Sequence, residues 1–237
     1  MDRQERRDLK HDKFVDEIGS LSTRARENQR LLLIIAASAV FVAVLAYGIY
    51  FFRSNREEKG QQALGKAIEA MESPLLPAPG APPVPEAKFK TEADRTAGAE
   101  KLFKDVESNS GGTDAADIAS LYLARIAAGK GDITSARTRF QKYVSDHSKD
   151  LLAEGARYSL YRLRIDNGEA PQVAQELQAE INKSEPVLPP DSLLNLLAHA
   201  WDVQGSVEKT KETYRRIVTE FPDSPYALEA QRRMGPA

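Results

Sequence analysis

The sequence predicts an all-α protein in which a single N-terminal transmembrane helix precedes a helical-repeat solenoid. Three observations carry this prediction. Residues 31–52 contain no charged side chain. In the rest of the chain alanine, leucine, glutamate, lysine and arginine dominate, whereas valine and isoleucine are sparse, which favours helix over strand. Apolar and glycine positions in the second half recur every 37 residues, and such a period is typical of stacked helix pairs.

The predicted membrane anchor begins at Leu31 and ends at Phe52. At about 1.5 Å per residue it spans roughly 33 Å as a helix, enough to cross a hydrocarbon core of about 30 Å. Arg30 and Arg53 flank it, and both side chains can reach lipid headgroups. A buried core helix is the alternative, but such segments usually run to about 10–14 residues. Signal peptides have apolar runs of about 7–15 residues and a small-residue cleavage site, so we expect an uncleaved single-pass anchor.

Composition excludes several classes of function. The chain has 33 basic and 35 acidic residues and a net charge of −2, so no nucleic-acid partner is expected. It has no cysteine, which excludes disulfides, thiolate metal sites and a cysteine nucleophile. The three histidines, His11, His147 and His199, have no metal-ligand spacing, and no phosphate-binding loop or nucleophile elbow occurs. We therefore expect no enzyme activity, cofactor or metal.

Residues 1–30 form the predicted head on one side of the membrane. Phe14, Ile18, Leu21 and Ala25 fall on one face of a helix, which favours a short amphipathic helix at the membrane surface or against a partner. A solvated tail is the alternative. Basic residues are balanced on the two sides of the anchor, so charge bias leaves the orientation of the chain open.

Residues 53–72 continue a helical apolar pattern and form the predicted linker and first repeat helix. Residues 73–90 are the predicted proline-rich loop, because residues 73–85 (SPLLPAPGAPPVP) contain six prolines and cannot continue a helix. We interpret this loop as a semi-rigid connector between two helices. The alternative is a docking site for a proline-recognising module.

Residues 91–237 are predicted to form the repeats and a C-terminal capping helix. Gly131, Gly168 and Gly205 stand 37 residues apart, where glycine suits the turn between two helices. The apolar sets with the same period are Leu123, Leu160 and Leu197; Phe140, Leu177 and Tyr214; and Val144, Ile181 and Val218. A closing helix near residues 225–234 would cover the last apolar face.

The last repeat, residues 193–222 (LLNLLAHAWDVQGSVEKTKETYRRIVTEFP), resembles a tetratricopeptide repeat. The matching positions are Leu194, Leu197, Ala198, Trp201, Tyr214 and Pro222, and Thr210 stands where that family prefers alanine. In the second unit Leu123, Ala124, Ala136 and Phe140 match. The third unit departs from the pattern, since Tyr161 replaces a small residue, Arg164 an aromatic one and Glu180 an apolar one.

The resemblance implies a concave groove lined by the first helix of each pair. The corresponding partner-binding residues are Leu121, Arg125, Tyr158, Arg162, Asn195 and His199. Arg125, Arg162 and His199 are 37 residues apart, so we expect a ladder that suits a peptide carboxylate or acidic segment. The alternative is that these arginines pair with acidic neighbours on their own helices.

The layout of head, anchor, linker helix and small repeat domain resembles the ancillary SecYEG translocon subunit family of bacterial inner membranes. The segments that carry the resemblance are FVD at residues 14–16, AEKLFKDVES at residues 99–108 and ADIASLYLARIAAGKGDITSARTRF at residues 116–140. It implies a cytoplasmic N-terminus, a periplasmic C-terminal domain, and translocon subunits, periplasmic chaperones or client peptides as partners. The proline-rich insertion departs from that family.

A second envelope role stays open. Residues 221–230 (FPDSPYALEA) resemble the repeats of proteins in cell-division coordination and outer-membrane assembly. The alternative function is therefore a periplasmic scaffold in one of those processes.

Overall fold

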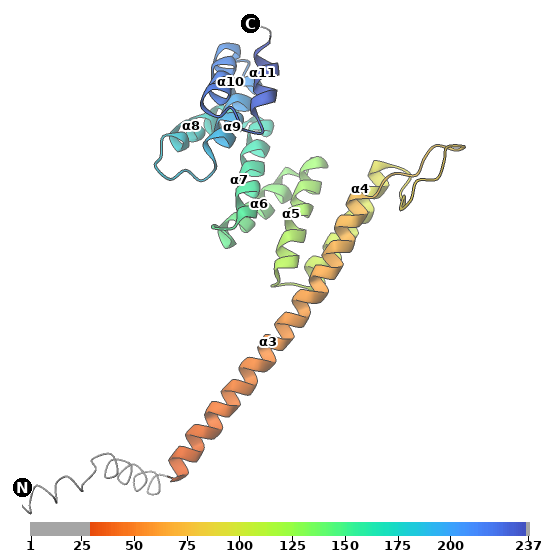
Figure 1. Cartoon of the computed structure of the whole chain (residues 1–237), viewed down its shortest axis with the longest axis vertical. Helices are drawn as coiled ribbons and strands as arrows, with labels where there is room; N and C mark the ends of the chain where they lie inside the picture. The colour runs from red at the N-terminus through yellow and green to blue at the C-terminus, as the bar shows by residue number, and fades with distance from the viewer. Residues whose placement is uncertain (1–28, 236–237) are drawn as a thin grey trace, which may run out of the picture. The chain divides into compact units, whose positions relative to one another are not determined.

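The computed structural model describes residues 29–235, which fold as helices joined by turns and loops (Figure 1). These residues contain no β-strand, so the predicted all-α repeat fold is confirmed. The chain divides into two units, one up to Arg56 and one from Glu57 onward. The amphipathic helix predicted around Phe14, Ile18 and Leu21 lies outside the described residues.

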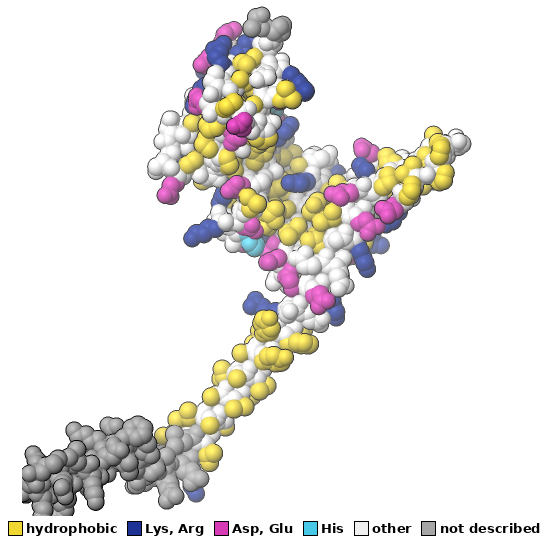
Figure 2. Space-filling model, in the orientation of Figure 1, with side chains coloured by type: hydrophobic (Ala, Val, Ile, Leu, Met, Phe, Trp, Pro, Cys, Tyr) yellow, Lys and Arg dark blue, Asp and Glu magenta, His cyan; other side chains and the backbone are white. Residues whose placement is uncertain are grey.

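The first unit contains the N-terminal part of α3 (Gln29–Glu72). Its large apolar side chains are exposed, among them Phe41 (64%) and Tyr50 (70%), and Figure 2 shows a hydrophobic surface along this helix. Water would be a poor solvent for so much contiguous apolar surface. By length and composition the helix can cross a membrane, as expected for the stretch from Leu31 to Phe52.

The second unit begins with the C-terminal part of α3, which packs against α4 (Glu92–Asn109) and α5 (Asp114–Gly129). Their shared core consists of Leu64, Ala67, Ala70, Ala99, Phe103, Val106, Ala115, Ala119, Leu123 and Ile126. The carboxylate of Glu57 accepts hydrogen bonds from the backbone N–H groups of Asp114 (3.0 Å) and Ala115 (3.3 Å). It therefore caps the start of α5, where the orphan N–H groups and the helix dipole favour a negative charge.

The C-terminal part of α3 and α4 form the first helix pair. Three further pairs and a capping helix follow it (Figure 1). They are α5 with α6 (Ile133–Asp146), α7 (Leu151–Arg164) with α8 (Ala170–Ile181), α9 (Pro190–Val203) with α10 (Val207–Glu220), and α11 (Ala227–Met234). Gly131, Gly168 and Gly205 lie in the turns inside the pairs, with φ values of +80°, +91° and +71°. Only glycine adopts this region without strain, which explains their period of 37 residues.

The periodic apolar side chains form the core of the pairs. Phe140, Leu177 and Tyr214 are buried on the second helices, and Leu123 and Leu197 on the first helices, whereas Leu160 is half-buried. Ala227 and Ala230 bury the inner face of α11, so this helix covers the end of the array.

The third pair joins its helices with charged side chains where the sequence departs from the repeat pattern. Arg164 donates two hydrogen bonds to Glu176, each of 2.7 Å, and one of 2.8 Å to Glu169. Arg137 of α6 also bonds Glu169, which ties the second pair to the third. Glu180 is buried, and it accepts a hydrogen bond from the backbone N–H of Val187 (2.7 Å) in the loop before α9.

Residues 73–91 separate α3 from α4 and contain no helix. They occupy the place that a short glycine turn has in the later pairs, where residues 130–132 separate α5 from α6. The proline-rich sequence thus enlarges the turn of the first pair.

Candidate functional site

Four of the six expected groove residues line one small hollow. Tyr158 and Arg162 come from α7, and Asn195 and His199 from α9. Leu196, Tyr214, Glu229 and Arg233 complete the lining. The hollow has a volume of about 230 Å³, below the ~300–1,000 Å³ usual for small-molecule sites, so its size suits one or two side chains of a partner.

Hydrogen bonds fix the polar side chains of this hollow. The amide Nδ2 of Asn195 donates to the hydroxyl of Tyr158 (2.7 Å), which links α9 to α7 across 37 residues. The Tyr158 ring is stacked on that of Tyr226, with centroids 6.3 Å apart and ring planes 4° from parallel. Burial raises the pKa of Tyr158, so its hydroxyl stays protonated at neutral pH and can donate to a ligand.

Asp166, in the turn after α7, joins two of the three basic side chains of the hollow, His199 and Arg162. Its Oδ1 lies 2.6 Å from Nε2 of His199, and its Oδ2 lies 3.7 Å from Nε of Arg162. Arg162 therefore has an acidic neighbour four residues away, which was the alternative interpretation of the groove arginines. Because 60% of the Arg162 side chain is exposed, this pair is weak and leaves the guanidinium available to a partner.

Leu121 and Arg125 of α5 do not line the hollow. Leu121 is half-buried against the core around Phe140, and Arg125 is exposed, with its guanidinium carbon 5.9 Å from the centre of the Tyr122 ring. Within residues 29–235 Arg125 forms no ion pair. The structure thus brings Arg162 and His199 together around Asp166 and leaves Arg125 outside the lining of their hollow.

Sequence reasoning missed Asp166, Tyr226 and the α11 residues Glu229 and Arg233. Asp166 follows Arg162 by four residues, and this spacing on a helix was a usable signal. Nη1 of Arg233 lies 3.8 Å from Oδ2 of Asp202, and Nε of Arg233 forms an ion pair with Glu229. The repeat pattern does not indicate Arg233, because the groove positions of tetratricopeptide repeats lie on the first helix of each pair.

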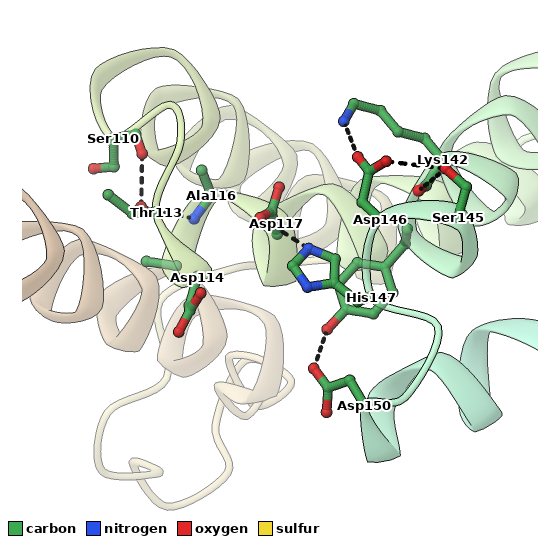
Figure 3. Close-up of polar contacts among 12 residues, drawn as sticks. Ser110, Thr113, Asp114, Ala116, Asp117, Lys142, Ser145, Asp146, His147 and Asp150 are labelled. Atoms are coloured by element: carbon green, nitrogen blue, oxygen red, sulfur yellow. Dashed lines mark hydrogen bonds and ion pairs between the residues drawn. The ribbon is translucent and has the colours of Figure 1, made fainter.

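A second hollow, of about 520 Å³, lies along α5 and α6. Figure 3 shows polar contacts in this region, among them that of His147, whose Nε2 lies 3.1 Å from Oδ2 of Asp117. The hydroxyl of Tyr143 donates to Asp150 (3.0 Å). Lys142 pairs with Asp146 at its rim. Burial, together with the bond to Asp150, raises the pKa of Tyr143. These contacts join α5, α6 and the residue that caps the start of α7, so we assign the cluster a structural role.

Metal chemistry has no candidate site in the described part of the chain, since residues 29–235 contain no group of three His, Cys, Asp or Glu side chains placed to hold an ion.

Trp201 is half-buried against the core of the third and fourth pairs, with Nζ of Lys209 4.3 Å from its ring centroid. It packs between helices and does not line the hollow described above.

A comparison with known protein families agrees with the helix pairs. A family model described as a tetratricopeptide repeat-like domain matches residues 27–185. Two structures of a putative kinesin light chain from Podosopora anserina, with nearly identical TPR-like repeats, are 17% identical to this chain and cover 60% of it and 77% of their own length. Their TM-scores are 0.45 and 0.44. No curated protein matches the chain.

Proposed function

Because this chain belongs to the tetratricopeptide repeat-like domain family, we propose that it is a membrane-anchored, non-catalytic scaffold that binds other proteins. The observation that carries this proposal is the hollow in which Tyr158, Arg162, Asn195 and His199 converge from two helices. It combines an aromatic ring, hydrogen-bond donors and cationic groups on rigid elements. Such a set suits an extended segment of a partner with an acidic side chain or a terminal carboxylate.

The partner that we propose is the SecYEG translocon, with its chaperones and exported clients. Two features support this choice: the apolar helix from Leu31 to Phe52, and the resemblance of residues 99–108 and 116–140 to the ancillary translocon subunit family. In this proposal the head is cytoplasmic, the helix crosses the inner membrane, and the repeats act in the periplasm. A scaffold in cell division or outer-membrane assembly is the alternative, favoured by residues 221–230.

Co-purification tests the partner. The full-length chain is purified from its own membranes in mild detergent, and the proteins that accompany it are identified by mass spectrometry. We expect translocon subunits, and we expect their loss when residues 31–52 are replaced by an unrelated anchor. Recovery of division or outer-membrane assembly proteins without the translocon would overturn the first proposal and support the alternative.

A pair of matched substitutions tests the hollow in the same experiment. Arg162→Glu reverses a charge in the hollow, whereas Arg125→Glu reverses the charge at the equivalent position of the second pair, outside it. We expect Arg162→Glu to lower the recovery of the partner about tenfold or more, and Arg125→Glu to change it less than about twofold. Equal losses of partner recovery in the two variants would show that the partner does not bind in this hollow.

A further inference from the structure

The base of the proline loop, Ser73–Lys90, is fixed to the helices on both sides. Ser73 is buried, its hydroxyl donates to the carbonyl of Ala70 (3.2 Å), and its own carbonyl accepts from Arg95 (3.2 Å). At the other end the backbone N–H of Leu76 donates to the carbonyl of Phe89 (2.8 Å). The Phe89 ring lies so close to α4 that a Cβ on Gly98 would be 2.6 Å from it. The loop therefore leaves the repeat array with both ends held in place.

The tip of the loop is rich in proline, and the carbonyl groups of Pro82 and Pro83 are open. Residues 82–84 lie outside helices and turns. Pro82, Pro83 and Pro85 fix φ near −65°, and each proline pushes the residue before it towards the polyproline II region. Among the described residues no hydrogen bond ends on the carbonyl of Pro82 or Pro83. A partner can thus reach both the proline rings and two free acceptors.

The loop also encloses an apolar hollow of about 690 Å³. Its lining is Leu76, Pro77, Ala78, Pro79, Ala81, Pro83, Val84 and Lys90, with no acidic side chain. Leu76 and Val84 are 43% and 41% exposed, and Figure 2 shows hydrophobic side chains over the loop beyond α4. Lys88 pairs with Glu69, whereas Lys90 forms no ion pair within the described part of the chain.

We propose that the proline loop is a ligand for an aromatic-lined groove on another protein, and that this groove carries an acidic residue opposite Lys90. Aromatic rings pack between proline rings, and tyrosine or tryptophan donors satisfy the free carbonyls of Pro82 and Pro83. The acidic residue complements Lys90, the one charged side chain of the hollow. The fixed base and the fixed φ angles reduce the conformational entropy lost on binding, so a short contact suffices.

The first step of the test locates the partner. The photoreactive residue p-benzoylphenylalanine replaces Val84 in the full-length chain, and Leu151, which is 77% exposed at the start of α7, receives it in a control chain. After irradiation in the native membranes we expect a protein adduct from position 84 that the control lacks. Absence of such an adduct, or an adduct with lipid only, overturns the proposal.

The second step tests the chemistry of the contact with the purified adduct partner. Calorimetric titration measures its binding to the full-length chain in detergent, to the same chain with Pro82, Pro83 and Pro85 all changed to alanine, and to the chain with Lys90→Glu. We expect the triple change to weaken binding at least about tenfold and Lys90→Glu to weaken it about threefold, with less effect at high salt. Binding that survives the triple change overturns the proposal.

The groove of the repeats and the proline loop share no residue, so the two proposals fail separately. Arg162→Glu should leave the adduct at position 84 unchanged. Loss of the adduct in that variant would show that one partner spans both surfaces and would contradict an independent site on the loop.

Discussion

The third and fourth helix pairs occupy equivalent places in the 37-residue period, yet different contacts hold them together. In the 37-residue register, Trp201 and Thr213 of the fourth pair correspond to Arg164 and Glu176 of the third pair. Ile217 is fully buried on α10, whereas its counterpart on α8 is Glu180. Two helices of a repeat can therefore be joined in either of two ways. Apolar side chains can pack between them, or charged side chains can form hydrogen bonds that compensate for their burial.

The two kinds of contact should respond differently to truncation, salt and pH. Apolar burial depends little on ionic strength, whereas the pairs of Arg164 are partly exposed and are screened. The largest loss of folding stability is therefore expected from a truncation in the fourth helix pair, whose contacts are apolar.

Leu194→Ala should produce that largest loss. Leu194 is fully buried between α9, α10 and α11, so its truncation should lower the free energy of unfolding by about 3 kcal/mol, within the usual range of about 2–5 kcal/mol. Urea unfolding of the full-length chain in detergent, followed by circular dichroism, measures it. A loss that depends strongly on salt would contradict the assignment of this pair to apolar packing.

Arg164→Met should cost less, about 1–2 kcal/mol, because the arginine is partly exposed and the carboxylates left behind can reach water. Hydrogen bonds from Arg137 and Arg164 lower the pKa of Glu169, and the two from Arg164 lower that of Glu176, both from an ordinary value of 4.5. The unfolded chain thus takes up these protons first as the pH falls.

The stability that these carboxylates contribute is therefore present above pH 4.5 and is lost as the pH falls below it. We expect Arg164→Met to flatten this loss in unfolding experiments between about pH 5 and pH 3. Leu194→Ala serves as the control, and it should keep the pH dependence of the unchanged chain.

Gly168→Ala and Gly205→Ala should each lower the free energy of unfolding by about as much as Arg164→Met does, because both glycines have a positive φ in the turns of their pairs. A Cβ in this region costs about 1–2 kcal/mol. Gly155→Ala is the matched control: Gly155 lies inside α7 with open space around it, so alanine should stabilise by up to about 1 kcal/mol. Thermal unfolding separates the three variants.

Thr210→Ala should have the smallest effect. Thr210 is buried where the second pair has Ala136, and its hydroxyl donates to the carbonyl of Ser206 (3.0 Å), one turn earlier. Removing donor and methyl group together leaves no unsatisfied group, and alanine favours helix, so the free energy of unfolding should change by less than about 0.5 kcal/mol. A loss above about 1 kcal/mol would show that this hydroxyl has a further partner.

Much of the fold could be predicted from the sequence, because glycine turns and apolar periods report backbone geometry directly. Gly131, Gly168 and Gly205 indicated the turns, and the buried Phe140 and Leu177 indicated the second helices. The contacts of the third pair could not be predicted. The sequence shows that Arg164 and Glu180 depart from the pattern, but which carboxylate or N–H group each one meets depends on the folded turn.

The candidate site was predicted less completely. Register gives Tyr158 and Asn195 equivalent positions on α7 and α9, and the structure joins them by a hydrogen bond. Tyr226 and Arg233 reach the same region from the C-terminal segment, through the packing of α11. Contacts of that kind lie outside any repeat period, so no spacing along the chain could report them.

The enlarged turn of the first pair also has a practical consequence. The end of α3 and the start of α4 are held side by side by Ser73, Arg95 and Phe89, so the core places no limit on the length of chain between them. Each doubling of such a loop costs only about 0.6 kcal/mol. The turn at Gly80, outside the segment from Pro82 to Pro85 that we propose to bind a partner, is therefore a suitable graft point for an epitope or a reporter domain that leaves both ends of the chain untouched.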